Sequence, residues 1–163
     1  MSPLALLIQA TTPAPIPAHG VAASVQFSHA PSDEQLARRF WAHRLEGTYS
    51  FRSLLDSGGL LANGSDAPVE ELDPWRGVVA AVLDHWRADE RLALGQALHA
   101  TCVAPGWLSH DERMRGTLVP GRLADLVVLD RDPFACEPEE LREVHVVATM
   151  VGGRWTHDPP PWD

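Results

Sequence analysis

Asp66 is the residue of this sequence best placed by type and spacing to do chemistry. It lies in Asn63–Val69 (NGSDAPV), between a glycine that lets the backbone approach closely and a proline that stiffens the exit. A carboxylate in such a place can bind a divalent metal ion or accept a proton from a metal-bound water. The spacing alone is also typical of an aspartate in a turn or at a helix N-cap, so both interpretations stay open.

His29 is the second candidate, within Gln26–Asp33 (QFSHAPSD). An imidazole there can act as a metal ligand, as an acid or base, or as a contact to substrate. It can equally be a loop histidine beside a capping aspartate, Asp33. The remaining histidines show no ligand spacing, and the sequence has neither a Ser-His-Asp order nor a glycine-rich phosphate loop.

The charge of the chain limits its partners. The 163 residues carry a formal net charge of −9, and all 13 basic residues are arginines. An acidic chain disfavours non-specific binding to nucleic acid or to anionic lipid, so we expect neither as a partner. Without lysine, the chain cannot supply a Schiff-base lysine or a carboxylated lysine as a metal bridge.

The cysteines and the apolar runs indicate a cytoplasmic protein. Cys102 and Cys136 form no CxxC pair, which favours a reducing compartment, and Cys102 falls in a helical pattern as an expected small core residue. No apolar run approaches the roughly 20 residues of a membrane span. The proline-rich start, residues 1–15, is expected to be a disordered leader.

Short apolar strands and helices alternate over residues 16–104, which is typical of a parallel α/β sheet or barrel. Asp66 and His29 each follow an expected strand, at the end where such folds place their active sites. A helix capped by Asp73 carries one apolar stripe as far as Trp86, and Pro105-Gly106 is expected to end the next helix. The expected strands are residues 20–27 and 60–64, and the expected helices begin near residues 33, 48, 74 and 93.

Residues 108–157 have a different pattern, with strands expected over 123–129 and 145–151. Gly152-Gly153 predicts a two-residue hairpin turn into residues 154–156. Residues 158–163, which contain three consecutive prolines, are expected to be a tail.

Together these segments resemble the C-terminal part of a metal-dependent amidohydrolase of the amidohydrolase-3 type. The resemblance covers residues 16–156. Its matching stretches, in order, are SVQFSH (24–29) with Asp33, YSFRSLLDSG (49–58), GSDAPV (64–69) with DPW (73–75), GTLVPGRLADLVVLDRDPF (116–134) and MVGGR (150–154).

The resemblance implies an α/β fold: the last strands and helices of a (β/α)8 TIM-type barrel in residues 16–107, then a small β-sandwich segment in 108–157. It also implies hydrolysis of a carbon–nitrogen bond, other than a peptide bond, in a small amide-type substrate by a metal-activated water. Asp66 matches the family's metal ligand and general base, and His29 matches a histidine that faces substrate. The implied cofactor is a divalent metal, with zinc expected.

The sequence also departs from that family. It has no His-x-His pair and no lysine, and it is too short for the other βα units. One hypothesis is an incomplete hydrolase, inactive by itself, whose other barrel portion is missing or lies on a second chain. The alternative is a non-catalytic remnant without metal that acts as a packing or interaction module, with a homo-oligomer as one outcome.

Overall fold

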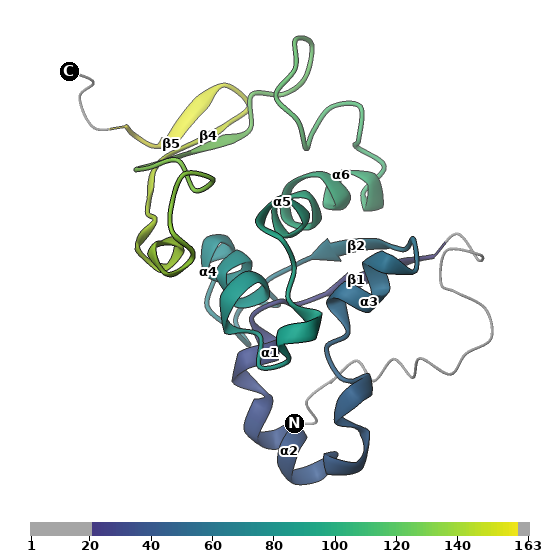
Figure 1. Ribbon diagram of the computed structural model, residues 1–163. Coiled ribbons are helices and arrows are strands. Elements are labelled where there is room, and N and C mark those ends of the chain that lie inside the picture. The colour runs from purple at the N-terminus through teal and green to yellow at the C-terminus, as the bar shows by residue number, and fades with distance from the viewer. Residues whose placement is uncertain (1–20, 160–163) are drawn as a thin grey trace. The chain divides into compact units, whose positions relative to one another are not determined.

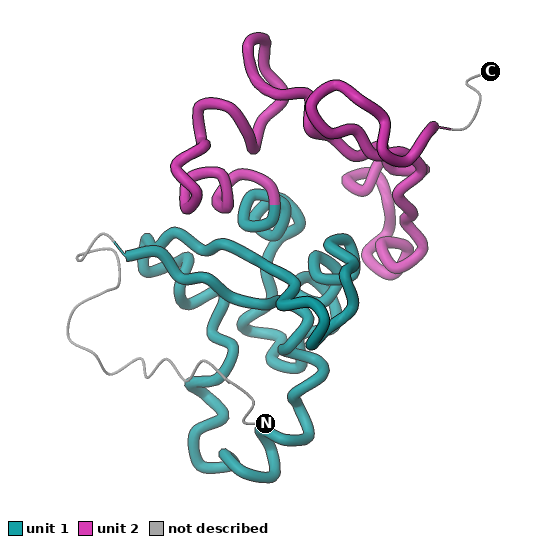
Figure 2. The backbone as a smooth tube through the Cα atoms, turned by 180° about the vertical axis from the view of Figure 1, so that it is seen from behind, with its two compact units in different colours: residues 1–101 teal, residues 102–163 magenta. Residues whose placement is uncertain are grey.

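The computed structural model describes residues 21–159 of the chain. The expected leader, residues 1–15, lies outside these residues, and so do residues 160–163 of the expected tail. The chain forms two compact units that divide between Thr101 and Cys102 (Figure 2). Within residues 21–159, no helix is both long enough and apolar enough to cross a membrane.

The first unit is a small parallel sheet with helices packed against it (Figure 1). Strand β1 pairs with β2 in parallel, with Ala22 opposite Leu60 and Val25 opposite Asn63. Both expected strands and the α/β class are therefore confirmed. Its elements are β1 (Ala22–Val25), α1 (His29–Ser32), α2 (Glu34–Phe40), η2 (Ala42–Gly47), α3 (Phe51–Asp56), β2 (Leu60–Asn63), α4 (Pro74–Val79), η3 (Ala80–Asp84), η4 (Ala88–Glu90) and α5 (Leu94–Leu98).

Aromatic and branched side chains from β1, α3, β2 and α4 form the core of this unit. The rings of Phe27 and Phe51 lie 5.0 Å apart in a tilted arrangement, and both are buried. Because Phe27 lies between the end of β1 and His29, its burial anchors the segment that leads to His29.

The helix expected from Asp73 begins as predicted but changes its winding. The Asp73 carboxylate accepts a hydrogen bond from the Arg76 amide at 3.0 Å, and Pro74 takes the first helical position. After Val79 the chain continues as the π-helix η3, and Ala80 and Ala81 are buried as well. The buried surface is therefore wider than the single predicted stripe, because a π turn shifts the residues that follow it around the axis.

Two expectations for the following helix are wrong. Pro105-Gly106 does not end it: the π-helix η5 (His99–Val103) leads into α6 (Ala104–Leu108), and Pro105 lies in the first turn of α6, which needs no amide donor from it. Cys102 is exposed rather than part of the core. The buried face carries Ala97, Ala100 and Ala104, whose spacing leaves Cys102 on another side of the helix.

The second unit contains an antiparallel sheet in the order β3-β4-β5. Gly152 and Gly153 both have left-handed φ values, 58° and 78°, as the predicted two-residue hairpin turn requires. Its further elements are β3 (Leu126–Leu129), η6 (Pro138–Glu143), β4 (Val146–Val151) and β5 (Arg154–His157).

Candidate functional site

The carboxyl ends of β1 and β2 lie side by side. Val25 is opposite Asn63 in the register, and the Gly64 amide donates to the Val25 carbonyl at 2.9 Å. Because the strands are parallel, the segments that carry His29 and Asp66 leave the sheet at the same edge.

His29 is the first residue of α1, and its side chain is only 13% exposed. Its amide donates to the Gln26 carbonyl at 3.3 Å, which closes the turn after β1. The Nε2 atom is buried and has no hydrogen-bond partner within residues 21–159. It lies 3.9 Å from Oδ2 of Asp66, which is too far for a hydrogen bond.

Asp66 holds a left-handed backbone conformation, with φ at 55°. Aspartate tolerates this region better than most residues because its short polar side chain can bond locally. The Val69 amide donates to the Asp66 carbonyl at 2.8 Å, which fixes the turn. The Asp66 side chain is 52% exposed, so its carboxylate is accessible to a ligand. The structure thus brings together both predicted site residues, while their roles stay predictions.

An open cavity of about 810 Å³ is lined by Ser28 and Ala67, the chain neighbours of His29 and Asp66, but not by His29 and Asp66 themselves. Its volume is typical of small-molecule sites. The Ser32 hydroxyl donates to the Glu70 carboxylate at 2.7 Å and so joins the two segments that line the cavity. The lining residues are Ser28, Pro31, Ser32, Ala67–Asp73, Arg76, Ala80 and Asp84.

The donor set falls short of a catalytic zinc site. His29 and Asp66 supply one nitrogen and one carboxylate, whereas a catalytic zinc takes about three protein ligands. Within residues 21–159, no group of three or more His, Cys, Asp or Glu side chains could hold a metal ion. The described residues therefore do not form such a site by themselves.

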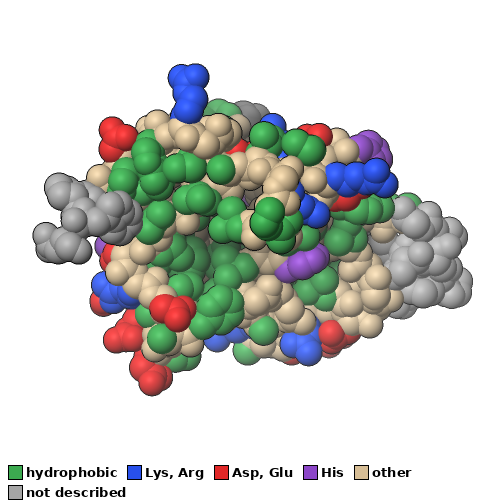
Figure 3. Space-filling view, turned by 90° about the horizontal axis from the view of Figure 1, so that it is seen from above, with side chains coloured by type: hydrophobic (Ala, Val, Ile, Leu, Met, Phe, Trp, Pro, Cys, Tyr) green, Lys and Arg blue, Asp and Glu red, His purple; other side chains and the backbone are tan. Residues whose placement is uncertain are grey.

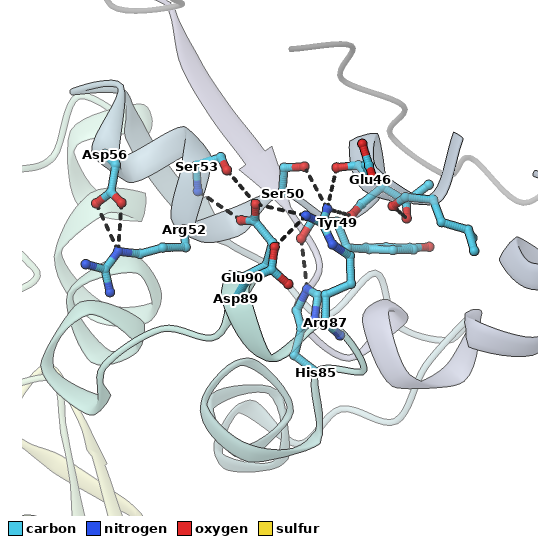
Figure 4. Close-up of polar contacts among 12 residues, drawn as sticks. Glu46, Tyr49, Ser50, Arg52, Ser53, Asp56, His85, Arg87, Asp89 and Glu90 are labelled. Atoms are coloured by element: carbon cyan, nitrogen blue, oxygen red, sulfur yellow. Dashed lines mark hydrogen bonds and ion pairs between the residues drawn. The ribbon is translucent and has the colours of Figure 1, made fainter. Parts of the chain in front are cut away.

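A second polar cluster joins η4 to α3 (Figure 4). The Glu90 carboxylate is buried and accepts hydrogen bonds from the amide and the hydroxyl of Ser53. Arg87 lies 3.4 Å from Glu90 and donates to the carbonyls of Glu46 and Thr48 at 2.6 and 3.1 Å. These contacts fix the segment between η2 and α3.

His85 lies fully buried beside this cluster. Its Nε2 is 2.8 Å from the Tyr49 carbonyl, and its Nδ1 accepts from the Arg87 amide at 3.0 Å. Since the carbonyl needs a donor and the amide needs an acceptor, the ring is the neutral Nε2–H tautomer. Burial lowers the pKa of His85 below its ordinary value, although the hydrogen bond to the Tyr49 carbonyl acts in the opposite direction.

The phenol of Tyr49 donates to the carboxylate of Asp33. Burial is the main cause that raises the pKa of Tyr49, and the bond to Asp33 adds to it. Tyr49 therefore stays protonated at neutral pH. Asp33 occupies the N-cap position of α2 but makes no side-chain capping bond there, because its carboxylate binds Tyr49 instead.

Sequence reasoning missed the structural importance of His85, Glu90 and Asn63. The apolar stripe that begins after Asp73 predicts that His85 lies on a helix, whereas the structure places it directly after η3, and the stripe does not show which groups face it. Glu90 was indistinguishable from a surface acid. Asn63 was visible as a polar residue at the end of an apolar strand, which is the one signal that could have identified it.

The amidohydrolase family model matches residues 6–157. The putative amidohydrolase YtcJ of Bacillus subtilis (strain 168) is 29% identical over 129 residues, which are 74% of this chain and 24% of that protein. N-substituted formamide deformylase of Arthrobacter pascens is 33% identical over 111 residues, 64% of this chain and 20% of that protein. An uncharacterized metal-dependent hydrolase from Pyrococcus horikoshii OT3 is 30% identical with a TM-score of 0.62, over 73% of this chain and 26% of that structure.

This chain therefore belongs to the amidohydrolase family, as the motifs predict. It spans about a quarter of the length of the curated relatives that it matches.

Proposed function

We propose that this chain takes part in hydrolysis of a carbon–nitrogen bond, other than a peptide bond, in a small amide-type substrate. One observation carries the proposal: the buried, unpartnered Nε2 of His29 lies 3.9 Å from the Asp66 carboxylate. The pair stands at the carboxyl ends of two parallel strands, and its chain neighbours Ser28 and Ala67 line a cavity of about 810 Å³. Family membership and the name of the deformylase relative support this class of reaction.

In this proposal Asp66 acts as the general base and His29 contacts the substrate. The exposed carboxylate of Asp66 accepts the proton of the attacking water, while the imidazole donates to or accepts from the amide group. The two strands would be the last strands of a partial (β/α)8 barrel, in residues 16–107, followed by the β-sandwich segment in 108–157. We place the protein in the cytoplasm.

A divalent metal, with zinc expected, belongs to this proposal only together with further donors. Asp66 would be one of its ligands, and the others would come from residues outside 21–159 or from another chain, a second copy included. We expect the isolated chain to be inactive for this reason. The similarity of this chain to two solved structures described as metal-dependent hydrolases supports the metal.

The alternative function is a non-catalytic packing or interaction module. It is favoured by one observation, that residues 21–159 contain no group of three metal-binding side chains. This alternative predicts that the chain hydrolyses no amide when zinc is added. It also predicts that addition of a second polypeptide does not produce hydrolysis.

The test first assays hydrolysis of an N-substituted amide by the chain with zinc chloride, and by the chain with zinc chloride and a second polypeptide. Asp66 is then replaced in the preparation that is active. Asp66→Asn removes the proton acceptor and should slow amine release by about 100-fold or more. Asp56→Asn is the matched control and should retain the rate, because Asp56 is an exposed partner of Arg52 on α3 and does not line the cavity. Full activity of Asp66→Asn would overturn the assignment.

A further inference from the structure

We infer that Asn63 is a positioning residue, whose side-chain amide fixes the separation of His29 and Asp66; the inference rests on the function proposed for that pair. Asn63 is the last residue of β2, directly before the segment that carries Asp66. Its Oδ1 accepts a hydrogen bond from the Phe27 amide at 2.9 Å. One side chain thus connects the segment before Asp66 to the segment before His29.

The orientation of this amide is determined by its partners. The Thr101 hydroxyl donates to the Ala97 carbonyl at 2.9 Å, so its oxygen is free to accept from Nδ2 of Asn63 at 3.3 Å. The Phe27 amide can only donate, so Oδ1 must face it. A Cβ on Gly77 would lie 3.4 Å from Nδ2, which shows that α4 packs closely against the amide.

Loss of the amide should loosen the site more than the fold. The Gly64–Val25 backbone bond and the buried Phe27 ring would still hold the strands together. The Phe27 amide, however, would lose its acceptor, and the turn that aims His29 at Asp66 would lose its only side-chain bond to β2 among the described contacts.

The experiment measures the pair directly by NMR on the full chain with ¹³C-labelled histidine. Asp66→Asn should change the His29 ring resonance in the wild-type background, since the two side chains are 3.9 Å apart. In the Asn63→Ala background the same change should be smaller by about twofold or more, because neighbouring groups couple non-additively. Asn63→Asp keeps an oxygen for the Phe27 amide and should restore most of the response.

Ser57→Ala is the matched control. It removes the hydrogen bond from the Ser57 hydroxyl to the Leu54 carbonyl, which lies in the segment that enters β2, at the end of the strand away from Asn63. It should leave the His29 response unchanged, which separates positioning from general loss of stability. An equal His29 response in wild type and Asn63→Ala would overturn the role of Asn63 and leave the proposed function standing. No response in the wild type would instead contradict the pairing of His29 with Asp66.

Discussion

His85 is a histidine that the fold keeps neutral. Its two ring nitrogens face a carbonyl and an amide, so a second proton would bring an N–H at Nδ1 against the Arg87 amide. Stacking against Trp86 and edge contact with Phe51 enclose the ring. A buried histidine with both nitrogens engaged has a structural role, which the sequence pattern alone could not assign.

Stability should fall in mild acid because of His85. Burial holds its pKa below the ordinary value, so the unfolded chain takes up the proton first as the pH falls. The contribution is complete above the ordinary pKa, about 6.5, and is lost as the pH falls below it, at up to about 1.4 kcal/mol per pH unit. Urea unfolding between pH 8 and pH 5 measures this slope.

His85→Gln should unfold at a lower urea concentration than wild type at pH 8. Its free energy of unfolding should nevertheless depend less on pH than that of wild type. His43→Gln, at an exposed position, is the control and should keep the wild-type slope. The same slope in His85→Gln and wild type would contradict the prediction.

Glu90 should contribute strongly to stability because it is a buried charge with matched partners. Glu90→Gln leaves Arg87 without its buried counter-charge and should lower the free energy of unfolding by roughly 2–4 kcal/mol. Asp89→Asn removes the other carboxylate that pairs with Arg87. Because the Asp89 side chain is 68% exposed, this change should lower the free energy of unfolding by less than about 1 kcal/mol. Equal costs for the two variants in denaturant titration would refute this difference.

At the scale of elements, the end of η5 packs closely against the loop that follows α6. Gly116 has φ at 88°, and a Cβ there would lie 3.0 Å from the Cys102 carbonyl oxygen and 3.1 Å from the Cα of Val103. The glycine is therefore required both by its conformation and by the close approach of backbone atoms.

Gly116→Ala should destabilise the second unit by about 2–4 kcal/mol, as strain and a backbone clash add. Gly121→Ala shares the left-handed φ, at 91°, but has open space around its Cβ position. It should cost only about 1–2 kcal/mol. Thermal unfolding followed by circular dichroism compares the two, and a larger loss for Gly121→Ala would show that the close approach is unimportant.

At the scale of the whole molecule, the described residues supply too few donors for a catalytic zinc, so both proposed functions predict little metal in the isolated chain. Purified chain should contain well under one zinc per chain by elemental analysis, because His29 and Asp66 fall short of about three ligands. Asp66→Asn should reduce any bound zinc further, with Asp56→Asn as the control. Stoichiometric zinc in the chain alone would contradict the shortage of donors and weigh against the non-catalytic module.

Apolar side chains are exposed alongside charged ones (Figure 3). Leu72 is 77% exposed and lines the cavity, and Val69 beside it is also exposed. In the part of the chain that the structure describes, β1 and β2 pair only with each other. These features are consistent with the proposed association with a further barrel portion or a second copy.

Local signals in the sequence determined the family, the α/β class and the candidates Asp66 and His29. Strand ends, the Asp73-Pro74 cap and the Gly152-Gly153 turn are readable because each depends on a few neighbouring residues. The proximity of Asp66 to His29, the tie through Asn63 and the burial of His85 were decided only by the tertiary structure. They depend on which strands pair and which helix faces meet, and segments far apart in the chain set those contacts together.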